Sequence, residues 1–413
     1  MPGFKRTKLA CYMAYFTMST IFSLPPLLFV TFKETFDISY TLLGTLVLIN
    51  FCTQLGVDLV FTVFSSKFNV HKIVKTMPLI TTVGLMIYAL VPTFFPQFAY
   101  AGLVAGTFVF SVSAGLSEVL LSPVIAAIPS QTPQKDMSTL HSLYAFGVFT
   151  VVIVSSIFFK LFTRANWMYL TMFFALWPVL AAVLFMLSPM PDMDVSHQSE
   201  ASTGRTKKKA FSLCLCVMCI FFGSCAENTM SSWVSGYMED ALHIDKAVGD
   251  ILGMAMFAVL LGCARIGYAK YGRNIMRVLL VGMAGAAVCY LTVSLCPGTV
   301  FPMIACMLTG LFTSMLWPGT LIMMEENVHG TGVAAFALMA AGGDLGASVA
   351  PQLMGIVADK VTVSQMAVRL SEKFSVTVEQ VGLRSGMLVC SLFPILGFVL
   401  VLYIMRYFRS EKA

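Results

Sequence analysis

The sequence predicts an all-α membrane protein with twelve transmembrane helices in two pseudo-symmetric six-helix bundles. Composition is the first reason: 58% of the 413 residues are hydrophobic and only 11% are charged, whereas soluble domains carry about 25% charged residues. The mean hydropathy of +0.85 agrees with this. Continuous apolar runs of about 20 residues or more, long enough to cross a bilayer, are the second reason. The third is their order, which is six runs, a polar segment and six more runs. Because the runs do not alternate polar and apolar residues, barrel strands are excluded.

The two sets of apolar runs define the domain organisation. The first set covers residues 8–30, 40–64, 73–92, 97–126, 137–161 and 166–188, and the second covers 210–236, 246–266, 275–296, 299–323, 332–357 and 383–407. Residues 1–188 are therefore expected to form an N-terminal bundle and residues 210–413 a C-terminal bundle. Residues 189–209 are polar and end in Lys207, Lys208 and Lys209, a composition typical of a flexible cytoplasmic linker. The first run has no small-residue cleavage site, so it is interpreted as a retained helix.

The distribution of basic residues predicts the orientation. With the N-terminus in the cytoplasm, 18 of the 26 lysines and arginines fall on the cytoplasmic side, as the positive-inside rule requires. We therefore expect both termini in the cytoplasm and the chain in the cell's inner (plasma) membrane. Arg265 is assigned to a cytoplasmic segment, so no basic residue is expected deep in the membrane.

A weak internal repeat supports two homologous halves. Lys67-Phe68 follows the second run and Lys270-Tyr271 follows the eighth, 203 residues later. A lysine beside an aromatic residue is common in cytoplasmic loops, so this similarity alone is weak evidence for a repeat. Together with the arrangement of six runs, a linker and six runs, it supports a duplicated six-helix unit.

Glu118 is the first candidate functional residue. It lies well inside the fourth run, in Gly115-Leu116-Ser117-Glu118, with no Lys or Arg within a helical turn. Ionisable residues at membrane depth are costly and usually line a pathway or bind a partner. A carboxyl group there can hold a proton at neutral pH, so Glu118 is the expected proton-coupling residue. Asp58 and Asp250 lie nearer the ends of their runs and are interpreted as helix-end or gating-loop contacts.

Glu227 and Asn228 are the second candidates, as substrate-binding residues in the outer half of the seventh run. Together they offer the donors and acceptors that a polyol or sugar needs, and Asn228 shares a helical face with Ser224, four residues earlier. Trp233 and Tyr237 follow in the same run and are interpreted as an interfacial aromatic belt.

Five further residues are weaker candidates for solute binding. Asp344 lies among glycines in the eleventh run, where close helix packing is an equal alternative. Trp317 precedes Pro318 in the tenth run and could stack on a sugar ring or fill the core. Gln54, Tyr144 and His141 complete the set, and His141 could titrate near neutral pH.

Several kinds of chemistry have no support in the sequence. The spacing of Cys216 and Cys219 lies within an apolar run without a second pair, so neither a metal site nor a disulfide framework is expected. No phosphate-binding loop and no hydrolase motif is present. We therefore expect no enzyme activity, no cofactor and no metal. Nucleic-acid binding is also not expected, because the net charge of +6 is scattered along the edges of apolar runs.

The arrangement of twelve runs with a basic central linker resembles the major facilitator superfamily over essentially the whole chain. Within it, the sequence is most similar to the fucose–galactose–glucose:proton symporter type. The segments that carry this similarity are Gly115-x-x-Glu118-x-x-x-x-Pro123, Leu140-His141-Ser142-x-Tyr144-x-x-Gly147, Trp317-Pro318-Gly319, and Gly343-Asp344-Leu345-Gly346 with Pro351 and Gly355. The resemblance implies a central cavity, alternating access, and uptake of a sugar coupled to a proton at Glu118.

One departure from the fucose type matters for coupling. That type also has an acid in its first helix, whereas residues 9–30 contain neither Asp nor Glu. If two acids are required, Glu227 or Asp344 would have to provide the second; otherwise the coupling differs from that of the fucose type.

The expected function is proton-coupled import of a sugar or a similar small polar solute by a monomer in the lipid bilayer. Sodium is an open alternative as the coupling ion. Proton-coupled efflux of drugs or metabolites is the main alternative function, since the spans are rich in Met and Phe. A non-transporting membrane receptor with a transporter fold is the other alternative.

Overall fold

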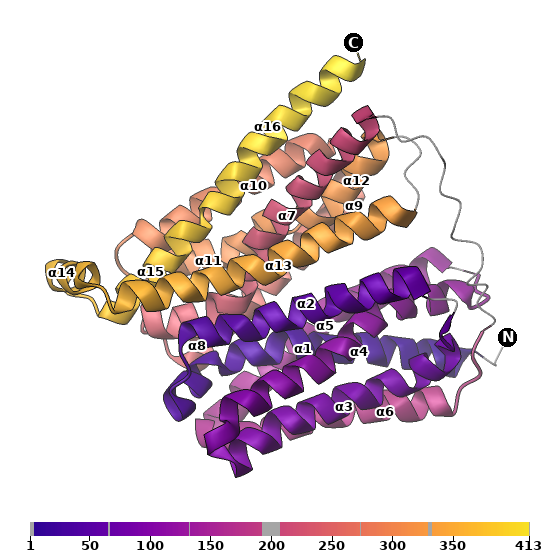
Figure 1. Ribbon diagram of the computed structural model, residues 1–413, viewed down its shortest axis with the longest axis horizontal. Helices are drawn as coiled ribbons and strands as arrows, with labels where there is room; N and C mark the ends of the chain where they lie inside the picture. Colours follow the sequence, from indigo (N-terminus) through magenta and orange to yellow (C-terminus); the bar gives the residue numbers. More distant parts are fainter. Residues whose placement is uncertain are drawn as a thin grey trace. The chain divides into compact units, whose positions relative to one another are not determined.

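The computed structural model describes residues 4–64, 67–131, 133–191, 207–272, 274–328 and 333–412, and these residues form helices and no strands. The helices are α1 (Lys5–Phe36), α2 (Tyr40–Phe64), α3 (Val70–Phe94), α4 (Ala99–Ala127), α5 (Pro133–Leu161), α6 (Trp167–Met186), α7 (Lys207–Gly236), α8 (Lys246–Gly249), α9 (Met256–Tyr271), α10 (Ile275–Leu295), α11 (Val300–Thr313), α12 (Leu316–Asn327), α13 (Val333–Thr362), α14 (Gln365–Phe374), α15 (Val378–Cys390) and α16 (Leu392–Lys412) (Figure 1). The predicted linker at 189–209 lies mostly outside the described residues.

All twelve predicted spans are helical where the structure describes them. Ten of the helical stretches are long and apolar enough to cross a membrane, and the apolar part of α5, Phe146–Leu161, is shorter. The remaining predicted span corresponds to α13, which has 30 residues. Helices are the expected form, because a membrane offers the backbone no water to satisfy its N–H and C=O groups.

Three of the predicted spans are interrupted helices. A π-helical turn, Asp250–Ala255, joins α8 to α9 within the eighth span. The tenth span divides into α11 and α12, and the twelfth into α15 and α16. Pro318 explains the division in the tenth, because proline has no N–H to donate to the carbonyl four residues earlier, which belongs to Ser314.

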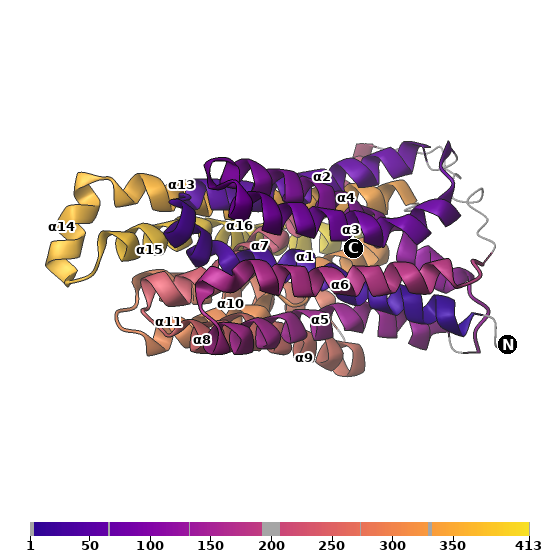
Figure 2. The same cartoon turned by 90° about the horizontal axis from the view of Figure 1, so that it is seen from below.

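The chain forms two compact units, Met1–Ile38 with Ile49–Gln198, and Ser39–Leu48 with Ser199–Ala413. In the first unit α3 packs against α4 and α6, while α1 packs against α5 and α6. In the second unit α10 packs against α11 and α16, while α7 packs against α13 and α16 (Figures 1 and 2). The same neighbours recur at equivalent positions, so each unit is built on the same six-span plan.

The loops that suggested a repeat also share their helix caps. The Asn69 side chain accepts a hydrogen bond of 3.0 Å from the Lys72 N–H at the start of α3. The Asn274 side chain accepts one of 3.2 Å from the Arg277 N–H at the start of α10. Each cap satisfies one of the N–H groups that a helix leaves open at its start.

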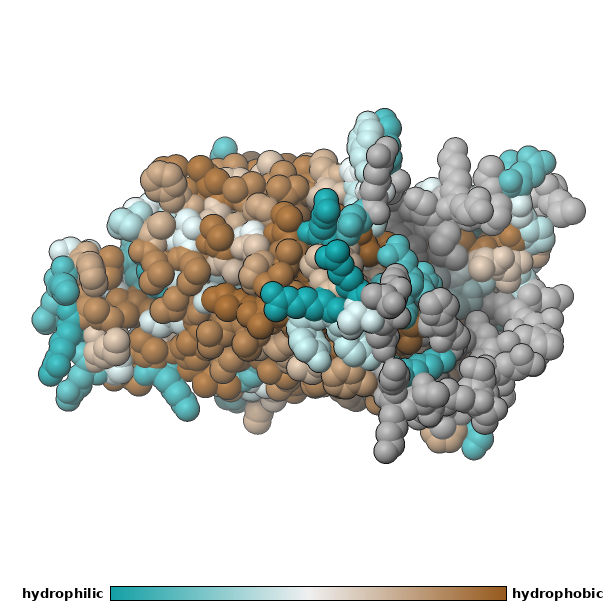
Figure 3. Space-filling view, turned by 90° about the horizontal axis from the view of Figure 1, so that it is seen from above, coloured by the Kyte–Doolittle hydropathy of each residue, from teal (hydrophilic) through white to brown (hydrophobic). Residues whose placement is uncertain are grey.

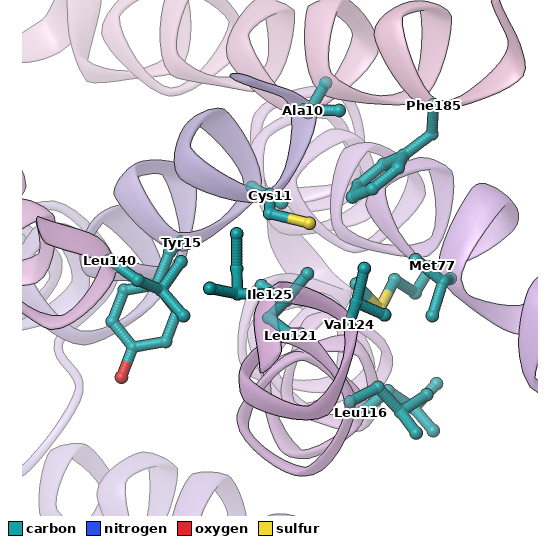
Figure 4. Close-up of a cluster of buried hydrophobic side chains, with 14 of the residues drawn as sticks. Ala10, Cys11, Tyr15, Met77, Leu116, Leu121, Val124, Ile125, Leu140 and Phe185 are labelled. Atoms are coloured by element: carbon teal, nitrogen blue, oxygen red, sulfur yellow. The ribbon is translucent and has the colours of Figure 1, made fainter. Parts of the chain in front are cut away.

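The core of the first unit consists of buried apolar side chains. Cys11 of α1 points toward Leu121 and Val124 of α4, whereas Ala10 of α1 lies nearer Phe185 of α6 (Figure 4). All five of these side chains are almost completely buried.

Apolar side chains also cover much of the outer surface. Leu176, Leu180, Val183 and Leu187 follow one face of α6 and its C-terminal end at helical spacing and are 46–64% exposed. Figure 3 shows hydrophobic side chains gathered over most of the coloured face, with hydrophilic groups mainly near the helix ends. In a membrane-spanning bundle such a stripe is the surface that faces lipid.

The first turns of α2 belong to the second unit. The backbone N–H groups of Tyr40 and Thr41 donate to the Asp359 carboxylate of α13 at 3.0 and 2.6 Å. Gly355, one turn earlier on α13, allows the Tyr40 carbonyl to approach the helix backbone. A carboxylate at a helix N-terminus satisfies open N–H groups and the helix dipole together.

Candidate functional site

In the first unit, the polar residues of α2 and α4 meet at a close crossing. A Cβ on Gly115 would lie 2.9 Å from the Val57 Cβ, so a larger residue there would push the helices apart. The crossing brings Asp58 of α2 close enough for the Glu118 charge on α4 to act on it. Glu118 itself is exposed on the surface of this unit and makes no hydrogen bond or ion pair to the described residues.

A buried polar network lies one to two turns from this carboxylate pair. Ser111 donates to the Asn50 Oδ1 at 2.6 Å, and the Gln54 Nε2 donates to the same oxygen at 3.2 Å. Asn50 and Gln54 are 7% and 1% exposed. Gln54, a predicted solute contact, therefore has a structural partner in this conformation.

The other candidates of the first unit lie on α5. The Tyr144 ring is half-buried and meets Phe22 edge-on, with ring centroids 5.8 Å apart. Phe22 in turn meets Phe51 at 5.7 Å. The backbone of His141 is helical, but its side chain lies outside the described residues.

In the second unit, Glu227 has a partner that the sequence did not suggest. The Arg265 Nη2 of α9 lies 3.3 Å from the Glu227 Oε1 of α7, and the Arg265 Nε donates to the Ser314 carbonyl at 2.9 Å. Arg265 lies inside the candidate span Lys246–Tyr268. It is three residues from the end of that span, so the expectation that no basic residue lies at mid-membrane depth stays a prediction.

Pro318 is the reason that this carbonyl is available. Without an N–H at position 318, the Ser314 carbonyl loses its helical donor, and an unsatisfied buried carbonyl is costly. The Gly319 N–H resumes the helical pattern by donating to Met315 at 2.8 Å. The break between α11 and α12 thus fixes the Arg265 side chain by giving its Nε an acceptor.

Asn228 is positioned as its spacing predicted. Its Nδ2 donates to the Ser224 carbonyl at 3.2 Å and to the Ser224 Oγ at 3.1 Å. The amide therefore has a fixed orientation on the half-buried face of α7, one residue from Glu227.

The tenth- and eleventh-span candidates, Trp317 and Asp344, lie where two helices pack closely. A Cβ on Gly343 would lie 2.3 Å from the Trp317 ring, so the indole of α12 packs directly on α13. Asp344, the next residue, is 6% exposed. The glycine therefore serves close helix packing here.

The interpretation of Trp233 and Tyr237 as an interfacial belt is wrong. Trp233 is 1% exposed and its Nε1 donates to the Pro351 carbonyl at 3.0 Å. Tyr237 is fully buried and its hydroxyl donates to the Val293 carbonyl at 2.7 Å. Both rings pack inside the second unit.

Asp250 belongs to a buried ionic cluster. Its Oδ2 lies 3.4 Å from the Lys246 Nζ, and Glu239 lies 3.7 Å from the same ammonium. Ser235 donates to the other oxygen of Asp250. Two π-helical turns, Tyr237–Ala241 and Asp250–Ala255, carry Glu239 and Asp250 toward Lys246.

The sequence profile of the Major Facilitator Superfamily matches residues 10–351. The chain belongs to this superfamily. Members of the superfamily are transporters, so this chain is a multi-pass membrane transporter and not an enzyme. No curated protein sequence matches it.

Solved transporters share the fold at low sequence identity. A D-xylose-proton symporter is 14% identical with a TM-score of 0.74, covering 94% of this chain and 96% of its own. A bacterial homologue of the human lysosomal transporter Spinster is 12% identical with a TM-score of 0.72, covering 98% and 97%. The E. coli fucose:proton symporter is 14% identical with a TM-score of 0.57, covering 97% and 99%. At these identities the likeness describes the fold.

The structure also brings forward three residues that the sequence interpretation missed or undervalued. Asp58 lies within range of the Glu118 charge, the Asn50 Oδ1 accepts two hydrogen bonds, and Arg265 pairs with Glu227. A signal existed only for Arg265, since it lies within its own apolar run and Pro318 leaves a carbonyl open in the run that packs against it.

Proposed function

We propose that this superfamily member is a symporter that couples import of a sugar or a similar small polar solute to a proton, by alternating access. The observation that supports it best is Glu118. It is a carboxyl group in a transmembrane helix, exposed on its unit, with the Asp58 carboxyl as an electrostatic neighbour. A negative charge within electrostatic range of a carboxyl group favours the protonated form of that group.

In this proposal Glu118 takes the proton and Asp58 is the second acid. Asp58 would fill the role for which the first helix has no acid. Because α2 and α4 touch at Gly115, a change in the protonation of either carboxyl would alter the repulsion across that crossing. Binding of the proton would thereby favour one conformation of the transporter over the other.

The solute would be recognised by polar and aromatic side chains. Glu227 and Asn228 would provide acceptors and a donor, Trp317 an aromatic face, and Gln54 a further amide. Tyr144, His141 and Asp344 are secondary candidates. The basic residues favour a chain that lies in the inner (plasma) membrane with both termini in the cytoplasm, acting as a monomer.

The test is uptake by the purified protein in proteoliposomes with an imposed inward proton gradient. Solutes for this assay come from a thermal-shift screen of sugars and related metabolites. We expect accumulation to follow the gradient in the wild-type protein and to be lost in Glu118→Gln, while solute exchange without a gradient persists. Glu372→Gln, an exposed glutamate of α14, is the matched control. Unchanged accumulation by Glu118→Gln would disprove the coupling role, and dependence on a sodium gradient instead would identify sodium as the coupling ion.

A further inference from the structure

Arg265 and Glu227 form an ion pair that reaches the surface of the second unit. The Arg265 side chain is 39% exposed and the Glu227 side chain 19%. A charged pair in membrane-spanning helices is too costly to face lipid, so this surface borders water or solute. The pair is therefore accessible to a molecule that the transporter carries.

The Arg265 guanidinium is bound through its Nε and through one contact of its Nη2. Its Nε is occupied by the Ser314 carbonyl at 2.9 Å, a fixed acceptor provided by the break before Pro318. Its Nη2 contacts Glu227, and its Nη1 makes no hydrogen bond to the described residues. Arginine presents five N–H donors in a planar fork, so most of this fork is free to bind a ligand.

Glu227 binds the Arg265 guanidinium through a single long contact. It contacts Arg265 through one oxygen at 3.3 Å, longer than the 2.7–2.9 Å of a strong charge-assisted bond. The other oxygen, Oε2, is buried and has no hydrogen-bond partner among the described residues. A planar carboxylate that approached Arg265 in bidentate fashion would bind it better than Glu227 does.

We propose that Arg265 is the anchor for a carboxylate group of the transported solute, and that Glu227 is the internal carboxylate that this group replaces. The solute class is then a small organic acid with hydroxyl groups, such as a sugar acid. Asn228, fixed by Ser224 beside Glu227, is placed to contact a hydroxyl of the same solute. This inference rests on the proposed transport of a small polar solute and names its chemical class.

The test compares acids with their neutral counterparts on the full-length protein in detergent micelles at constant ionic strength. The probes are D-glucuronate against D-glucose, D-galacturonate against D-galactose, and D-gluconate against sorbitol. We expect at least one acid to raise the Tm by about 5 °C near saturation, as ligand linkage predicts for a unit of this size, while its neutral counterpart has no effect. Arg265→Gln should remove the shift, and Arg277→Gln, an exposed arginine at the start of α10, should keep it.

Two further variants keep the test decisive if Arg265→Gln does not fold. Arg265→Lys keeps the charge without the planar fork and should weaken binding of the acid about tenfold or more. Glu227→Gln removes the competing carboxylate and should strengthen it. The proposal is overturned if no acid shifts the Tm, if acid and neutral probe act alike, or if the shift survives in the Arg265 variants.

Uptake measurements separate this inference from the proposed coupling. Proton-driven accumulation of a neutral sugar without acid binding would support the proposed function and overturn this inference. Arg265-dependent binding and transport of an acid that ignores the proton gradient would support this inference and disprove the coupling.

Discussion

Gly355 on α13 lies where any side chain would collide with the backbone of α2. A Cβ there would be 2.3 Å from the Tyr40 carbonyl oxygen and 2.8 Å from the carbonyl carbon, closer than real Cβ contacts come. Tyr40 cannot simply retreat, because its N–H and that of Thr41 are bound to Asp359. Replacing Gly355 with Ala must therefore displace the first turn of α2 or stretch both bonds to the carboxylate.

The expected cost follows from these contacts. Overpacking of a tight site costs about 1–3 kcal/mol, and each weakened hydrogen bond to a charged group forfeits part of about 1.5–3 kcal/mol. Against this, Ala is favoured over Gly in a helix by about 1 kcal/mol. A net loss of about 2 kcal/mol would lower the Tm by about 4–8 °C for a domain of 150–250 residues.

The assay is thermal unfolding of the purified protein in detergent, followed by intrinsic tryptophan fluorescence. Trp233 reports on the site directly, because its ring would lie 3.2 Å from the new Cβ. Gly262→Ala is the matched control, since a Cβ on this glycine of α9 would meet nothing within 4 Å, and it should hold or raise the Tm. If Gly355→Ala melts at or above the temperature of Gly262→Ala, the close approach of Tyr40 to α13 does not exist.

Three other predictions follow from single side chains. Lys8, with Ser130, holds the pKa of Asp136, at the start of α5, below its usual value. The carboxylate therefore stabilises the fold fully above the ordinary Asp pKa of about 4, and this contribution is lost as the pH falls through the lowered native pKa. Asp136→Asn should lower the Tm at pH 7, and the difference from wild type should shrink as the pH falls below about 4; a difference that does not shrink would contradict this. Asn69→Ala and Asn274→Ala should each cost about 1 kcal/mol as lost N-caps, whereas Asn166→Ala, at a helix start without a side-chain cap, should cost less. Tyr237→Phe should lower the free energy of unfolding by about 1 kcal/mol, because a buried hydrogen bond is lost. Tyr271→Phe is the control and should be neutral, since Tyr271 is 73% exposed. Equal effects of the two changes would argue that Tyr237 lies at an interface after all.

The helices could be predicted because each span is a continuous apolar run that can be recognised without knowledge of the rest of the chain. Residues 40–64 were expected as one run, and α2 covers Tyr40–Phe64. Pro318 indicates a break in the tenth span, but the sequence does not show which group binds the carbonyl that the break leaves open. That group is Arg265, whose hydrogen bond to Ser314 joins residues 49 positions apart.

The candidate site could be predicted only one helix at a time. Glu118, Glu227 and Asp344 stood out because a carboxyl group in an apolar run is unusual wherever it points. Their surroundings differ because each depends on another helix: Asp58 lies within range of the Glu118 charge, Arg265 pairs with Glu227, and Trp317 packs on Gly343 next to Asp344. Trp233 and Tyr237 were misplaced for the same reason, since a burial partner on a distant helix leaves no trace near them in the chain.

The sequence by itself determined that this protein crosses the membrane in two similar six-span halves, with acids where lipid would exclude them. It could do so because the free energy of transfer into a bilayer is summed residue by residue along each run. Only the tertiary structure decided which acid has a basic partner, which aromatic rings are buried, and that Arg265 lies inside a span with a guanidinium open to a ligand. Those outcomes depend on which helix faces meet, and that is set by packing between residues far apart in the chain.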